Sequence, residues 1–143
     1  MSRELRTIYF KLLIPAVSGI FGFFLLKVFG FFTVGQLRIT PILAPVTFVL
    51  SVIFAAALPV FLRTLFAHRM RFQKHTSAQD LIKLERHLIF SALVSPYLVI
   101  PAFLFEFPQI YFAGTVLMAL YAAYFFFPSE RRLRFEKRVF RVK

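Results

Sequence analysis

The chain has 143 residues, of which 59% are hydrophobic, and it carries a formal net charge of +12 at pH 7. Its mean hydropathy of +0.76 is too high for a soluble domain of this length, so the composition favours a membrane protein. The sequence contains no cysteine, which excludes disulfides, thiolate metal sites and cysteine nucleophiles.

Four long apolar stretches predict four transmembrane helices, because a spanning helix needs about 20 mainly apolar residues. We expect these helices at residues 9–32, 42–64, 86–105 and 110–127, all within one membrane domain. The predicted fold class is therefore all-α, a polytopic membrane protein built as two helical hairpins. The basic N-terminal segment resembles a signal sequence, but no convincing cleavage site follows it, so we interpret the first stretch as a retained helix.

The basic residues lie mainly on one side of this predicted arrangement. Sixteen of the 18 precede the first apolar run, which begins near Leu12, lie between the second and third runs, or follow the fourth. Only Lys27 and Arg38 lie elsewhere. The positive-inside rule then places both termini, the loop at 65–85 and the tail at 129–143 in the cytoplasm. We expect a multi-pass protein of the cell inner (plasma) membrane.

The tail has more cations than orientation requires, and apolar side chains are interleaved with them. At helical spacing Phe135, Val139 and Val142 share one face, while Leu133 and Phe140 lie on another, which indicates a moderately amphipathic helix along the interface. Each cation near an anionic leaflet contributes on the order of 1 kcal/mol. We therefore expect the loop and tail to bind anionic lipid headgroups or a partner. The predicted contact residues are Arg69, Arg71, Lys74, Arg131, Arg132, Arg134, Lys137, Arg138 and Arg141.

A polar site in the third helix is the alternative prediction. Pro96 and Pro101 remove backbone donors and should kink this helix, and such breaks sometimes line substrate sites in transporters. The candidate ligand-binding residues are Ser91, Ser95, Tyr97 and Lys27. The simpler interpretation is that the serines bond carbonyls freed by the prolines and that Lys27 extends to the interface. For Lys27, binding an anionic headgroup or pairing with Glu106 is the alternative.

The polar residues point to no recognisable chemistry. No carboxylate lies clearly inside the membrane, as proton-coupled export would require: Glu106 is expected at the outer turn, and the others are expected in the cytoplasm or at the interface, namely Glu4, Asp80, Glu85, Glu130 and Glu136. The three histidines match no metal-binding spacing, and no catalytic triad, phosphate loop or pair of carboxylates can be placed. We therefore expect no metal, no cofactor, no nucleic-acid partner and no enzymatic activity.

Ser77, followed by Asp80, fits a helix N-cap, so helical structure should begin near Ala78.

Two functional hypotheses follow from the sequence. The first is a subunit, scaffold or anchor of a membrane complex, whose helices pack with a protein partner or form a homo-oligomer. Small-residue patterns such as Ser51-x-x-x-Ala55 and Ala119-x-x-x-Ala123 would permit close helix contacts. The alternative is a small oligomeric transporter or channel with a polar site near the third helix.

Overall fold

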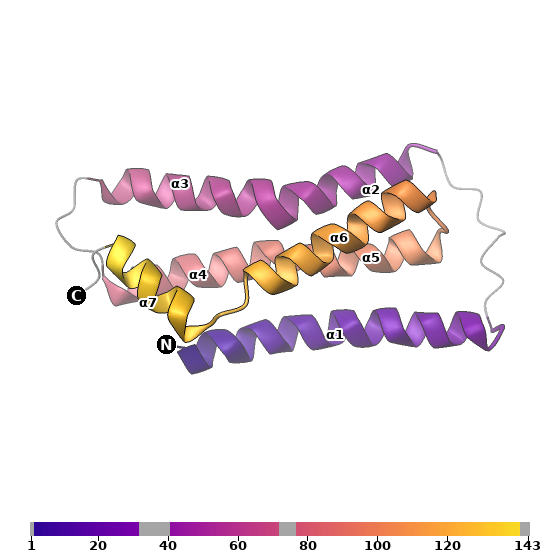
Figure 1. Cartoon of the computed structure of the whole chain (residues 1–143), viewed down its shortest axis with the longest axis horizontal. Helices are drawn as coiled ribbons and strands as arrows, with labels where there is room; N and C mark the ends of the chain where they lie inside the picture. The colour runs from indigo at the N-terminus through magenta and orange to yellow at the C-terminus, as the bar shows by residue number, and fades with distance from the viewer. Residues whose placement is uncertain (1, 32–40, 72–76, 141–143) are drawn as a thin grey trace.

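The computed structural model describes residues 2–31, 41–71 and 77–140, which form helices and short connections (Figure 1). The helices are α1 (Ser2–Val28), α2 (Leu43–Val52), the π-helical η1 (Ile53–Ala57), α3 (Leu58–Met70), α4 (Ala78–Ala92), α5 (Val94–Leu104), α6 (Gln109–Phe125) and α7 (Glu130–Val139). The described ranges contain no strand, so the prediction of an all-α protein is confirmed.

Within the described residues, three helical stretches are long and apolar enough to cross a membrane. They are Arg3–Val28, Leu43–Met70 and Ala78–Leu104, with 26, 28 and 27 residues. The segments Gln109–Phe125 and Glu130–Val139 pass the same criteria only together, and the chain bends by 76° between them. The described helices are thus compatible with a membrane protein of three to four spans.

Prolines accompany the irregular points of the long helices. Pro59 cannot donate to the carbonyl of Ala55, and the wider turn η1 ends two residues before it. The third long helix is interrupted at Leu93, where ψ is 0°, and Pro96 follows in the first turn of α5. Pro101 lies inside α5. The predicted irregularity near Pro96 is therefore a break between two helices.

The first two long helical stretches pack mainly on other helices rather than on each other, unlike the first of the two predicted hairpins. α1 packs mainly against α4 and α5, whereas α2, η1 and α3 pack against α4, α5 and α6. The first two stretches in the chain therefore lie on either side of α4 and α5 (Figure 1). The contact between α5 and α6 is the most extensive, and these helices are joined by a short turn in which Glu106 has a positive φ of 47°.

The buried apolar core is largest at the end of the bundle that α7 covers. One cluster joins η1, α4 and α6, and its buried members are Ala55, Leu81, Leu84, Leu88, Ala92, Ala122 and Phe126. A second joins α1, α4 and α7 through Leu5, Tyr9, Ile89, Leu93 and Leu133. The opposite end has the smaller cluster Ala44, Ala102 and Phe107. The larger buried apolar clusters therefore lie toward the α7 end, whereas the most extensive helix–helix contact is between α5 and α6.

Candidate functional site

α7 has a capped N-terminus, and its apolar side chain Leu133 packs against the bundle. Ser129 is its N-cap, and the Ser129 hydroxyl accepts a hydrogen bond of 3.2 Å from the backbone N–H of Arg132. Glu130 lies in the first turn, where a negative charge complements the helix dipole. Leu133 packs into the cluster shared with α1 and α4. The Leu133 contact places this face of α7 toward α1 and α4.

Four charged side chains from three helices meet beneath α7. Arg132 Nη2 lies 3.2 Å from Glu85 Oε2 of α4, and Arg132 Nε lies 3.7 Å from Glu136 Oε1. Glu136 also forms an ion pair with Arg63 of α3. The side chains of Glu85 and Glu136 are buried, with 0% and 3% exposed. We call Arg63, Glu85, Arg132 and Glu136 the ion network; it joins α3, α4 and α7 and has no net charge.

Arg132 makes further contacts that hold it in this position. Its Nη1 donates a hydrogen bond of 2.9 Å to the carbonyl oxygen of Phe125, at the C-terminus of α6. Its guanidinium carbon lies 5.2 Å from the centroid of the Phe126 ring, within the range of a cation–π contact. Burial lowers the pKa of the Arg132 guanidinium, and the adjacent Glu85 carboxylate opposes that shift. Arg132 therefore links α7 to both α4 and α6.

The ion network is not fully satisfied by hydrogen bonds. Arg63 Nε and Glu136 Oε2 are buried and have no hydrogen-bond partner. A buried polar atom without a partner costs about 1–3 kcal/mol, and charged groups cost more. The stability of this buried network therefore depends on every partner being present.

The sequence prediction missed this network. It placed Glu85 and Glu136 in the cytoplasm or at the interface because neither lies in an apolar stretch, and it counted Arg132 among the cations that bind lipid or a partner. The Arg132 side chain is only 15% exposed and points toward Glu85. One local signal was present: Arg132 and Glu136 are four residues apart and flank Leu133, so they share the inward side of a helix.

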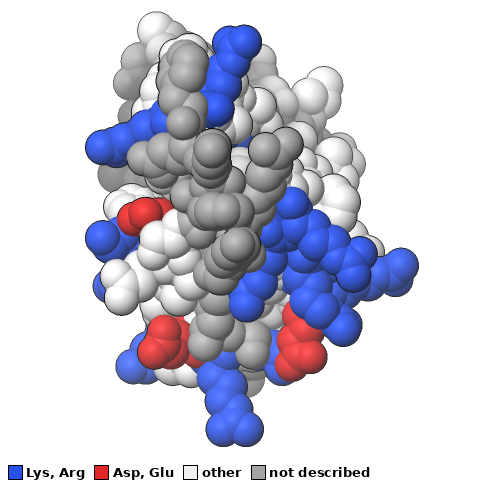
Figure 2. Space-filling view, turned by 90° about the vertical axis from the view of Figure 1, so that its left-hand side faces the viewer, with Lys and Arg blue, Asp and Glu red and all other residues white. Residues whose placement is uncertain are grey.

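The other tail cations that the structure describes lie on the exposed side of α7. Arg131, Arg134 and Arg138, together with Phe135, line a shallow hollow of about 270 Å³. Lys137 is also exposed. Figure 2 shows lysine and arginine side chains gathered on this end of the bundle.

The predicted loop cations lie at the same end. Arg69 and Arg71, at the end of α3, are exposed. Lys74 and Arg141 lie outside the described residues. The exposed basic surface at this end therefore comes from both α3 and α7, which lie far apart in the sequence.

The predicted polar residues of the third helix each have a separate partner. Ser95 is fully buried, and its Oγ lies 2.7 Å from Ser51 Oγ of α2. The Ser91 hydroxyl donates to the carbonyl of Leu88 at 3.0 Å. The Tyr97 hydroxyl donates to the carbonyl of Leu12 in α1 at 2.6 Å. These three side chains therefore join different neighbours and do not converge on one partner.

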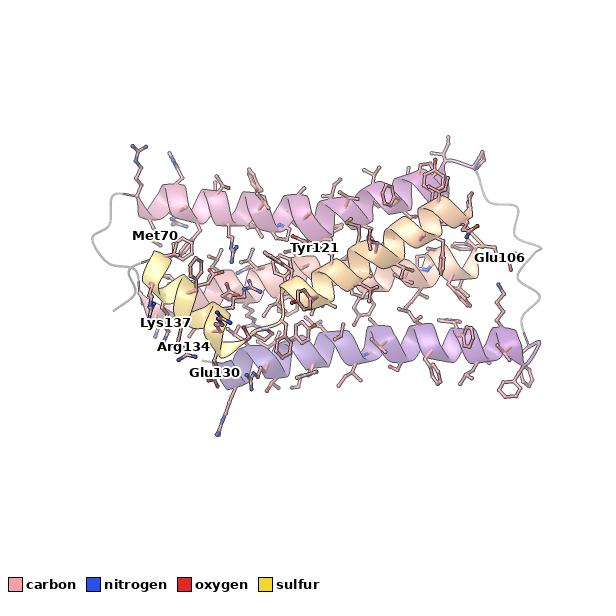
Figure 3. The ribbon with its side chains drawn as sticks, in the orientation of Figure 1. Met70, Glu106, Tyr121, Glu130, Arg134 and Lys137 are labelled. Carbon is pink, nitrogen blue, oxygen red and sulfur yellow. The ribbon has the colours of Figure 1, made fainter. Side chains whose placement is uncertain are left out.

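Lys27 lies at the end of the bundle opposite α7. Its Nζ is 2.8 Å from Glu106 Oε1, so the pairing considered from the sequence is present. The two side chains are 40% and 52% exposed. Figure 3 shows Glu106 at one end of the bundle and Arg134 and Lys137 at the other. Lys27 is thus separated from the predicted polar residues of the third helix and belongs to a different surface.

Comparison of the chain with protein-family models, with curated proteins and with solved structures finds no match. The class of protein is therefore defined by the structure alone: an all-helical bundle whose apolar helices are compatible with a membrane protein. Within residues 2–31, 41–71 and 77–140, no group of three or more metal-ligating side chains occurs.

Proposed function

We propose that this protein is a non-enzymatic, multi-pass membrane protein that acts as a subunit, scaffold or anchor, and that α7 binds anionic lipid headgroups at the cytoplasmic surface. The observation that carries the proposal is the division of charge on α7. Arg132 and Glu136 point inward to the ion network, whereas Arg131, Arg134 and Arg138 surround an exposed hollow. One face of the helix thus attaches it to the bundle, and the other is free to bind anions.

The direction of α7 supports a contact with the membrane surface. The 76° bend after α6 turns α7 away from the direction of the last span. Phe135 and Val139 are exposed beside the arginines, which gives α7 apolar side chains for the acyl boundary and cations for phosphate. Guanidinium groups bind phosphate oxygens through paired hydrogen bonds. The arrangement therefore fits an interfacial helix bound to acidic phospholipid.

The ion network supplies the rigidity that such a site needs. A helix that is fixed before binding loses less conformational entropy when its ligand arrives. Arg132 and Glu136 hold α7 on α3 and α4, so the three outward arginines are presented together. The other exposed cations at this end, including Arg69 and Arg71, add to the long-range attraction of an anionic leaflet. The positive-inside rule assigns this end to the cytoplasm.

Native mass spectrometry of the full chain with competing lipids tests the proposal. We expect the wild-type protein to retain phosphatidylglycerol in preference to phosphatidylcholine, and the triple variant Arg131→Gln, Arg134→Gln, Arg138→Gln to lose most of this preference. The matched control removes three other exposed cations at the same end, with Arg3→Gln, Lys83→Gln and Arg86→Gln. Equal losses in both triple variants would show that net charge, not the face of α7, determines lipid binding.

A tagged pull-down in mild detergent tests the role in a complex. A stoichiometric partner or a defined homo-oligomer is the expected result. If the protein instead remained a monomer without a partner, its role as a subunit or scaffold would be wrong, while lipid binding by α7 would be judged separately by the lipid competition.

The transporter or channel hypothesis has no comparable observation in its favour. Ser95 is engaged with Ser51, and Tyr97 with a carbonyl of α1. Because the chain has no native cysteine, Ser95→Cys offers a direct check. Rapid modification of this cysteine by a polar thiol reagent in intact membranes would favour the transporter hypothesis over ours.

A further inference from the structure

An apolar groove runs along the side of the bundle between α1 and α6, with α5 as its floor. Its volume is about 610 Å³, and every side chain that lines it is apolar. Val17 and Phe21 of α1 and Leu120 of α6 line it while remaining largely exposed, so the groove opens sideways. For a helix bundle in a membrane, this opening faces the lipid.

One end of the groove adjoins a pair of opposite charges. Phe103 and Phe112 line the groove and also a second hollow of about 330 Å³ that contains Lys27 and Glu106. Lys27 Nζ lies 5.1 Å from the centroid of the Phe103 ring and 2.8 Å from Glu106 Oε1. The groove therefore ends beside an exposed cation and an exposed anion, at the end of the bundle opposite α7.

We propose that the groove binds one acyl chain of a phosphatidylethanolamine-type lipid, with its phosphate at Lys27 and its ammonium at Glu106. The length of the groove fits one leaflet. From Phe112 to Ala123, which both line the groove, α6 rises about 16.5 Å at 1.5 Å per residue. The hydrocarbon of one leaflet is about 15 Å thick, half of a typical core.

The charges favour a zwitterionic headgroup over an anionic one. A headgroup with only negative charge would be attracted by Lys27 but repelled by Glu106, because Glu106 Oε1 lies 2.8 Å from Lys27 Nζ. A phosphate and a primary ammonium can each pair with the side chain of opposite sign. The site is therefore distinct in headgroup chemistry from the arginine face of α7, and it does not depend on the function proposed for that face.

The rim of the groove favours an acyl chain over a protein helix. Membrane helices associate through small residues that allow close backbone approach, and a helix with its side chains is about 10–12 Å wide. Here Val17, Phe21 and Leu120 form the exposed rim, and the small Ala119 lies below them in the groove. A flexible hydrocarbon chain can pass between large rim residues, whereas a second helix would contact them first.

Tryptophan fluorescence can measure which lipid occupies the groove, because the chain has no native tryptophan. Phe21→Trp places the only tryptophan at the groove, at a side chain that is 60% exposed. Leu117→Trp is the matched control. Leu117 is 61% exposed on α6 and does not line the groove. It directly follows Val116, which does line the groove, so the control tryptophan lies beside the groove along the length of α6. Each variant of the full chain is reconstituted in vesicles of equal phosphatidylethanolamine and phosphatidylcholine, with bromine on the acyl chains of one lipid or of the other.

We expect brominated phosphatidylethanolamine to quench the Phe21→Trp protein about five times as effectively as brominated phosphatidylcholine, a ratio equivalent to about 1 kcal/mol. The two lipids should quench the Leu117→Trp protein equally, because that position samples bulk lipid. Adding Lys27→Gln and Glu106→Gln to Phe21→Trp should remove the difference without changing helical content.

Three results would overturn the proposal. Equal quenching of the Phe21→Trp protein by both lipids would mean that the groove does not select a headgroup. Stronger quenching when brominated phosphatidylglycerol replaces phosphatidylethanolamine would mean that Lys27 acts alone as a cation. Weaker quenching by every lipid than in the Leu117→Trp protein would mean that a protein segment, such as a second copy of the chain, fills the groove.

Discussion

The two ends of the bundle use the same kind of ion pair with very different surroundings. At the α7 end, Arg132 and Glu85 are 15% and 0% exposed and belong to a network that joins three helices. At the other end, Lys27 and Glu106 are 40% and 52% exposed and form a single pair. Exposed pairs contribute about 0–1 kcal/mol, whereas removing one partner of a buried pair costs several times more. The comparison therefore separates a buried network that joins three helices from an exposed single ion pair.

The largest effect is expected from removing the centre of the buried network. Arg132→Met leaves Glu85 and Glu136 buried without their shared cation and also removes the hydrogen bond to the Phe125 carbonyl. We expect a loss of about 3–5 kcal/mol in the free energy of unfolding. Denaturant unfolding in detergent micelles, followed by circular dichroism, measures it. Arg134→Met on the exposed side of α7 is the control and should change stability by less than about 0.5 kcal/mol.

Replacing the whole network should reverse most of that loss. With Met at positions 63, 85, 132 and 136, no buried charge remains, and side chains of similar length fill the same space. Such replacements of buried ion networks are often neutral or stabilising by about 1–4 kcal/mol relative to the wild type. We expect the quadruple variant to be more stable than Arg132→Met in the same unfolding assay. A quadruple variant no more stable than the single one would show that the network is needed for more than charge balance.

The helices could be predicted from the sequence because their signals are local. The apolar stretches indicated the long helices, and Ser77 correctly marked the start of α4, where its hydroxyl accepts a hydrogen bond from the N–H of Gln79. The grouping of Leu133 with Phe140 also matched a real face of α7, since both pack inward. Each of these features depends on residues within a few turns of one another.

The ion network and the groove could not be predicted in the same way. Glu85 and Arg132 are 47 residues apart, and nothing in the sequence around either indicates that they meet. Hydropathy counts a buried glutamate as surface, because it does not include the cation that compensates its burial. The groove depends on α1 packing against α5 rather than against its neighbour in the chain, which is a tertiary property. The irregularity of the third long helix was predicted correctly. The partners of Ser95 and Tyr97 were not predicted.

An intermediate effect is expected from the buried hydroxyl pair between the two ends. Ser51→Ala or Ser95→Ala leaves the other hydroxyl buried without its partner at 2.7 Å. Side-chain hydrogen bonds between membrane helices average about 0.6 kcal/mol, with a maximum of about 1.7 kcal/mol. We expect each single variant to lose stability in this range and the double variant to lose less than the sum of the two. Strict additivity in this double-mutant cycle would show that the two hydroxyls do not interact.

The smallest effect on stability is expected at the exposed pair. Lys27→Gln and Glu106→Gln should each change the free energy of unfolding by less than about 1 kcal/mol, because water and salt already screen the pair. That small change should shrink further at high salt, whereas the loss in Arg132→Met should persist because its network is buried. Measuring both variants at low and high salt in the same detergent provides the contrast. A salt-independent loss of several kcal/mol from Lys27→Gln would contradict this expectation. The pair would then stabilise the fold, and neither Lys27 nor Glu106 would be free to pair with a lipid headgroup instead.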